Sequence, residues 1–116
     1  MMNLEDLKKN MGIVNLIDWD MTPEEAVRLY LEWGNNWTRG NYVVRSKDDV
    51  AHYFVVNTWN DPIIYLIKRN SEDAIELAHI EIPQDLKNQF MESIGHNKGV
   101  YAIDDKIREW LKSKLL

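Results

Sequence analysis

Residues 52–82 read HYFVVNTWNDPIIYLIKRNSEDAIELAHIEI, and the alternation of apolar runs with polar turns in this stretch decides the fold class. Three runs are rich in β-branched and aromatic side chains, which favour strands. They cover residues 52–59, 63–69 and 74–82. Because the two connections are short and contain Asn, Asp, Pro and Ser, neighbouring strands are expected to run antiparallel. The stretch therefore predicts a meander of three strands over residues 52–82.

The apolar patterns within these runs predict where each strand lies in the sheet. Residues 63–67 are apolar on both faces, which is typical of an interior strand that is covered on both sides. In the third run, the apolar residues up to Leu77 share one phase of the alternation, whereas those from Ile80 onward share the other. The change of phase predicts either a β-bulge near Ala78, where one extra residue shifts the alternation, or a strand that starts late.

Helices are expected on both sides of the meander in the sequence. Thr22-Pro23-Glu24-Glu25 combines an N-cap Thr, a Pro at the first helical position and a Glu at the third, which is a capping box. With Gly34 as a stop, it predicts a helix over residues 23–33. Apolar residues at helical spacing predict two C-terminal helices, over residues 84–94 and 103–115, that cover the middle strand like a hairpin.

Shorter signals complete the expected organisation. Asn3 can cap a short helix that ends at Gly12. The remaining expectations are a strand or extended core segment over 13–19, a loop over 35–41, a short strand over 42–45 and a loop over 98–101. The predicted fold is one α+β domain over residues 1–116, with a three- to four-stranded, mostly antiparallel sheet.

Composition excludes several classes of function. The chain has 116 residues, no cysteine and a formal net charge of -5. Without cysteine it forms no disulfide, no Cys-ligated zinc or iron–sulfur site and no thiol nucleophile. Its start lacks the basic and apolar regions of a secretory signal, and no apolar run approaches the ~18 residues of a transmembrane helix, so we expect a cytoplasmic protein without membrane contact. Charges of both signs are spread along the chain, so nucleic-acid binding is not expected.

The tryptophans are the first candidate for a binding surface. Aromatic faces beside amide side chains suit stacking and hydrogen bonding to planar ligands or sugars. The alternative is that the indoles fill the core, as the place of Trp33 on a helical stripe indicates. Trp37 lies in a segment rich in Asn and Gly, so among these indoles it is the one we expect to be exposed. The predicted binding surface comprises Trp37, Asn35, Asn36, Arg39, Asn60 and Asp61.

Catalytic and metal sites have weaker signals. His52, His79 and His96 lie in different expected elements and lack metal-ligand spacing. Asp18 and Asp20 precede a helix start, where the helix dipole favours acidic residues. No Ser-hydrolase motif and no phosphate-binding loop occurs. We therefore predict no catalytic residue, no metal and no cofactor, and keep a small enzyme with a carboxylate and histidine site as an alternative.

Residues 78–115 resemble the ribbon-helix-helix family of small bacterial repressors, because a strand is followed by Pro83-Gln84-Asp85 and then by two helical segments. The resemblance implies a dimer that pairs residues 78–82 of two copies and lays this ribbon in the major groove of DNA. The groove-facing residues would be Leu77, His79 and Glu81. Leu and Glu match base edges poorly, which departs from the family's chemistry. Trp33-Gly34-Asn35-Asn36-Trp37 also resembles a segment of small uncharacterised bacterial proteins.

These observations predict a small non-enzymatic bacterial domain that binds a protein or a small ligand. A ribbon-helix-helix-like DNA-binding regulator is the first alternative, and it would use a homodimer through the strand at 78–82. The second alternative is the small enzyme.

Trp37→Ala tests the predicted surface. If Trp37 belongs to an exposed binding surface, its truncation should leave the free energy of unfolding almost unchanged, as for other exposed side chains. Chemical denaturation measures this. A loss of about 3–5 kcal/mol, the size of a core truncation, would place the indole in the core instead.

Overall fold

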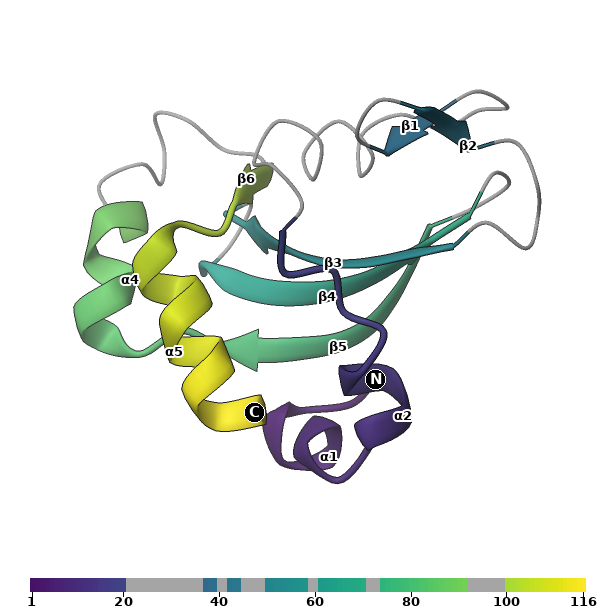
Figure 1. The fold of residues 1–116 in the computed structure, drawn as a ribbon. Coiled ribbons are helices and arrows are strands. Elements are labelled where there is room, and N and C mark those ends of the chain that lie inside the picture. The colour runs from purple at the N-terminus through teal and green to yellow at the C-terminus, as the bar shows by residue number, and fades with distance from the viewer. Residues whose placement is uncertain (21–36, 40–41, 45–49, 59–60, 71–73, 92–99) are drawn as a thin grey trace.

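A computed structural model describes residues 1–20, 37–39, 42–44, 50–58, 61–70, 74–91 and 100–116. Its main sheet is antiparallel and has four strands in the order β5-β4-β3-β6, with helices packed on it (Figure 1). The strands are β3 (Ala51–Asn57), β4 (Ile63–Arg69), β5 (Ala74–Glu81) and β6 (Val100–Ala102). This confirms the predicted α+β class and the three-stranded meander, with β4 in the interior of the sheet.

The fourth strand, β6, shows that the loop expected over residues 98–101 is wrong for Val100 and Tyr101, while residues 98 and 99 lie outside the described part of the chain. Strand β6 pairs antiparallel with β3, with Val56 opposite Tyr101. A strand of three residues is too short to show an alternating pattern, and its partner is far away in the sequence. Strand β6 therefore forms because β3 offers an edge, not because of a local signal.

The predicted bulge is present in β5. Leu66 of β4 lies opposite Ala78, whereas the next residue, Ile67, lies opposite Glu76. Leu77 is thus the extra residue, directly beside the predicted position. The bulge turns Ala78 and Ile80 towards the core, where both are buried, and so corrects the phase of the apolar pattern.

The N-terminal segment forms two short helices, α1 (Leu4–Lys8) and α2 (Met11–Val14). Asn3 caps α1 as predicted, and the Asp6 side chain completes a capping box. The expected stop at Gly12 is wrong, because Gly12 lies inside α2. Asn10 restarts the helix, since its Oδ1 accepts a hydrogen bond from the Ile13 amide at 3.2 Å. The strand or extended segment expected over 13–19 is wrong for Ile13 and Val14, which lie in α2, whereas Ile17 forms a parallel bridge with His52 of β3.

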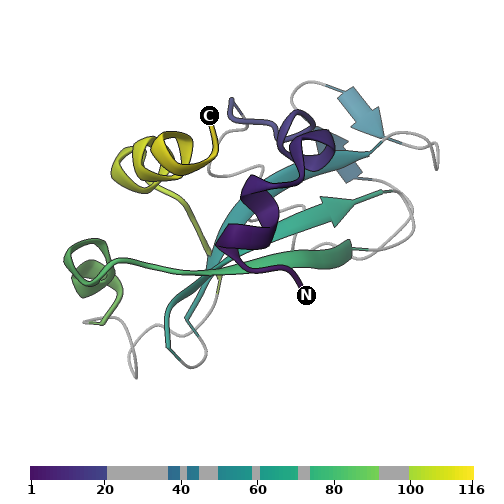
Figure 2. The ribbon, with the colours of Figure 1, turned by 90° about the horizontal axis from the view of Figure 1, so that it is seen from below.

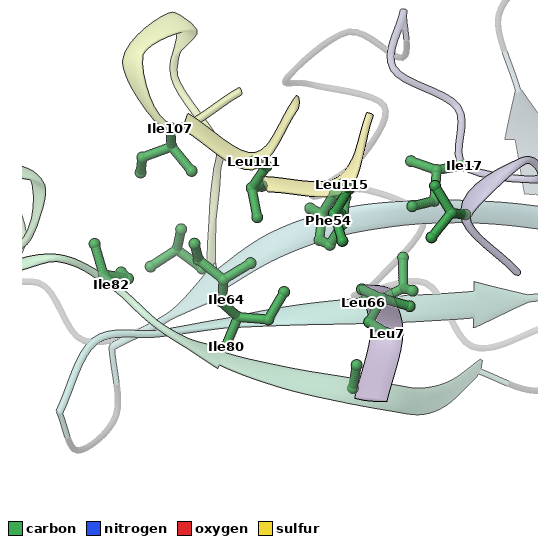
Figure 3. Close-up of a cluster of buried hydrophobic side chains, with 13 residues drawn as sticks. Leu7, Ile17, Phe54, Ile64, Leu66, Ile80, Ile82, Ile107, Leu111 and Leu115 are labelled. Atoms are coloured by element: carbon green, nitrogen blue, oxygen red, sulfur yellow. The ribbon is translucent and has the colours of Figure 1, made fainter. Parts of the chain in front are cut away.

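Helix α5 (Asp105–Leu115) supplies the apolar stripe that covers the sheet. Asp104 begins it as N-cap, and its Oδ1 accepts a hydrogen bond from the Ile107 amide at 2.8 Å. Side chains of the stripe meet those of the strands in one cluster (Figure 3). The cluster includes Ile107, Leu111 and Leu115 from α5 and Phe54, Ile64, Leu66 and Ile80 from the sheet. Leu7 of α1 and Val14 of α2 join it, so α1, α2 and α5 share one face of the sheet (Figure 2).

The opposite face of the sheet is also buried at its centre. Tyr53, Val55 and Ile67 are at most 1% exposed, and they alternate with the helix-facing residues of β3 and β4. Arg69 is buried beside them and donates a hydrogen bond to the Asn70 carbonyl at 2.8 Å. The sequence predicts burial of both faces for β4. In the structure, burial of both faces is more complete in β3 than in β4.

Helix α4 (Gln84–Met91) departs from the predicted hairpin-like cover. It lies beyond the ends of the strands, whereas α5 lies over them (Figures 1 and 2). Among the α4 side chains whose burial is described, Leu86 packs against the core and is half-buried. The predicted part of this helix beyond Met91 and the predicted helix over 23–33 lie outside the described residues.

A separate antiparallel hairpin comprises β1 (Trp37–Arg39) and β2 (Tyr42–Val44), with Thr38 opposite Val43. The expected loop over 35–41 is therefore wrong for Trp37–Arg39, whereas the strand expected over 42–45 is confirmed for Tyr42–Val44. Among the helices that the structure describes, none is long and apolar enough to cross a bilayer.

Leu111→Ala tests the packing of α5. Leu111 is fully buried, so the variant should lower the free energy of unfolding by about 2–5 kcal/mol through lost burial and a residual cavity. Leu16→Ala is the matched control, because Leu16 is 57% exposed and its loss should cost little. Chemical denaturation of both variants checks this, and equal stabilities would contradict the central place of α5.

Candidate functional site

Three of the six predicted surface residues, Trp37, Arg39 and Asp61, lie in the part of the chain that the structure describes. Asp61 is exposed in the segment before β4, and Trp37 and Arg39 lie at opposite ends of strand β1. The other three, Asn35, Asn36 and Asn60, lie outside the described residues. The surface around Trp37 therefore stays a prediction.

Two of the other tryptophans pack against described parts of the molecule. The ring of Trp19 is half-buried and lies 5.5 Å from the Phe54 ring, with the Lys112 Nζ 5.8 Å from its centroid. Trp19 therefore packs against the core, which agrees with the alternative interpretation of the indoles. Trp110 is half-buried on α5, and its carbonyl accepts a hydrogen bond from the Ser113 hydroxyl at 2.6 Å.

The ionisable candidates are dispersed. His52 is buried in β3 and His79 is half-buried in β5, while His96 lies outside the described residues. Asp18 accepts a hydrogen bond from the Asp20 amide at 3.0 Å, which organises the local turn. Within the described ranges, no group of three or more His, Asp or Glu side chains is placed to hold a metal ion.

The edge of strand β5 is the first unusual feature of the sheet. Met2 lies beside it in a parallel bridge with Ala78. The Met2 amide donates to the Leu77 carbonyl at 3.1 Å, and the His79 amide donates to the Met2 carbonyl at 3.0 Å. Met2 thus satisfies two outward backbone groups of the strand, the Leu77 carbonyl and the His79 amide, which would otherwise be open to pairing.

A groove lies where Met2 leaves this edge and the chain turns into α1. Its volume is about 420 Å³, and it is open to solvent. Three separate segments form its walls. They are Asn3, Leu4 and Glu5 at the start of α1, His79, Ile80 and Glu81 of β5, and Trp110 of α5.

The groove combines an apolar wall with an acidic rim. Leu4, Ile80 and Trp110 belong to the core cluster or pack against it, so their positions are fixed by the fold. Glu81 is exposed, and the Glu5 side chain is 72% exposed. The Lys8 Nζ lies 3.1 Å from a Glu5 carboxylate oxygen, but it does not line the groove. The site therefore offers apolar contact and negative charge side by side.

A second hollow, of about 570 Å³, lies between the starts of α4 and α5 and is lined by Asp85, Leu86, Asp104, Asp105 and Lys106. Its acidic side chains have structural roles. Asp104 caps α5, and an Asp105 carboxylate oxygen lies 2.9 Å from the Arg108 Nη1. Acidic residues at a helix start are stabilised by the helix dipole, so this hollow needs no ligand to explain it.

Comparisons of the chain with protein-family models, with curated proteins and with solved structures find no match. The groove is therefore defined by its geometry alone. The sequence pattern predicts that His79 and Glu81 lie on a strand with outward side chains and that Trp110 lies on a helix. It does not predict that these residues lie next to residues 3–5 in one groove. A backbone bridge through one residue leaves no pattern in a sequence, so no local signal could have found it.

Met2→Pro tests the backbone bridge at the edge of β5. Proline lacks the amide that donates to the Leu77 carbonyl, so the variant should lose about 0.5–1.5 kcal/mol of stability. The His79 amide should also exchange faster with deuterium, because its acceptor is the Met2 carbonyl. Met2→Leu is the control that keeps the amide and a similar volume. Equal protection of the His79 amide in both variants would contradict the importance of this bridge.

Proposed function

We propose that this chain is a non-enzymatic binding module that works in the cytoplasm and takes its ligand in the groove between α1, β5 and α5. The observation that carries the proposal is an open groove in which a tryptophan and aliphatic side chains lie next to carboxylates. Its volume falls within the roughly 300–1,000 Å³ that is typical of small-molecule sites. Indole side chains combine a large apolar surface with low conformational entropy, which suits them to recognition.

The ribbon-helix-helix alternative receives less support from the same edge. A ribbon through residues 78–82 would pair the outward backbone groups of β5 with those of a second copy. Met2 already hydrogen bonds to two of these groups, at Leu77 and His79. A symmetric ribbon would therefore have to displace Met2. Light scattering of the protein at roughly tens of micromolar tests this alternative. A monomer at that concentration would exclude the homodimer, and with it the DNA-binding dimer.

Isotope-labelled protein tests the groove with a panel of probes, since the natural ligand is unidentified. Aromatic fragments and short peptides of differing charge are titrated, and amide and indole chemical shifts are recorded by NMR. We expect the perturbed signals to gather on residues 3–5, on His79–Glu81 and on the Trp110 indole, since these line the groove. Trp110→Ala should abolish these shifts, whereas Leu16→Ala, which changes an exposed apolar side chain elsewhere, should keep them.

Two results would contradict the proposal. Perturbations confined to the β1–β2 hairpin would move the binding site to the predicted surface around Trp37. The absence of any perturbation across the panel at about millimolar ligand, where even weak pocket binding is visible, would remove the groove as a binding site.

A further inference from the structure

We propose that the groove binds an extended, cationic segment of a partner protein, which adds to the edge of β5 and continues the row of backbone hydrogen bonds that Met2 begins. This inference rests on the proposed function, because it names the partner and the binding mode of the same groove.

The backbone of β5 supports strand addition. In an antiparallel ladder, alternate residues direct both of their backbone groups to one side. Leu77 and His79 bond outward to Met2, so Glu81 also directs its amide and carbonyl to this edge. In the described part of the chain, Met2 is the single partner bridged to the edge, and its bridge ends at His79. The carbonyl of His79 and both backbone groups of Glu81 therefore face the groove.

The two sides of an added strand would meet different chemistry. Ile80 points towards the helices, and Leu4 and Trp110 lie on that side, so alternate side chains of the partner would face apolar surface. The side chains of His79 and Glu81 point to the other side of the sheet by the same alternation. An extended segment with alternating apolar and polar residues matches this arrangement, as in other cases of β-strand addition.

Charge selects the sign of the partner. Glu5 and Glu81 are exposed on the rim, and the described residues that line the groove include neither lysine nor arginine. The Asn3 side-chain oxygen is less available to a partner than the carboxylates, because this Oδ1 already accepts a hydrogen bond from the Asp6 amide at 2.9 Å. The ion pair of Glu5 with Lys8 is exposed and therefore weak, so the Glu5 carboxylate still contributes negative charge to the rim. The net charge of -5 attracts cationic partners at longer range.

The segment that fits is short. Met2 occupies one end of the edge, and Pro83, which lacks an amide, follows the other end after Ile82. Few main-chain hydrogen bonds are therefore available, and we expect weak binding, with a dissociation constant of roughly 10 µM to 1 mM.

The test uses the peptide Lys-Val-Lys-Val-Lys with blocked ends, titrated into the isotope-labelled full chain by NMR. We expect saturable shifts at the amides of His79, Ile80 and Glu81. Glu81→Lys should weaken binding by about tenfold or more, whereas Asp20→Lys, which changes the net charge equally at an exposed site outside the groove, should weaken it much less. The peptide Glu-Val-Glu-Val-Glu should not bind.

Main-chain pairing is tested with two modified peptides. One carries N-methyl groups on the lysine amides, and the other carries them on the valine amides. Because an added strand directs alternate amides to its partner, one peptide should lose binding and the other should keep it.

Each contrary outcome has a distinct meaning. If both N-methylated peptides bind as well as the parent, or if the acidic peptide binds equally well, strand addition of a cationic segment is overturned. If aromatic fragments bind the groove but the basic peptide produces no shift, this inference fails while the proposed function stands. If neither fragments nor peptides perturb the groove, both fail.

Discussion

The contact between the apolar stripe of α5 and one face of the sheet is the constraint on which the described structure depends. Ile107, Leu111 and Leu115 pack on Phe54 and its neighbours, and each buried aliphatic side chain contributes about 1.5–3 kcal/mol. This contact also fixes the rotation of the helix about its axis. Trp110, one position before Leu111, is thereby held at the flank of the stripe, where it becomes a wall of the groove. The packing that stabilises the domain thus also shapes its candidate site.

The parts of the fold that could be predicted from the sequence are those with a local physical signature. The runs that form β3, β4 and β5 are rich in apolar residues over seven or eight positions and are separated by polar turns, and the phase change before Ala78 indicated the bulge. Strand β6 and the Met2 bridge have no such signature, because they are held by backbone hydrogen bonds to strands distant in sequence. The second short helix was missed because Asn10 recaps the chain where Gly12 suggested a stop.

The candidate site could not be predicted for a related reason. Its residues come from positions 3–5, 79–81 and 110, and the three segments meet only because Met2 and α5 bring them to one edge of the sheet. The sequence instead predicts a binding surface at Trp37 and the neighbouring Asn side chains, where the composition is most unusual. Composition identifies residues that are suited to binding, whereas a groove depends on which of them the topology gathers.

The pairing of β6 with β3 has a consequence for how the chain reaches its native state. Val55–Asn57 of β3 pair with residues 100–102, and α5, which covers one face of the sheet, follows at residues 105–115. Contacts between segments so distant in sequence impose a large loop-closure entropy and slow folding. During synthesis from the N-terminus, β3 is made well before either of its later partners. We therefore expect the growing chain, rather than the folded protein, to be the species most prone to aggregation.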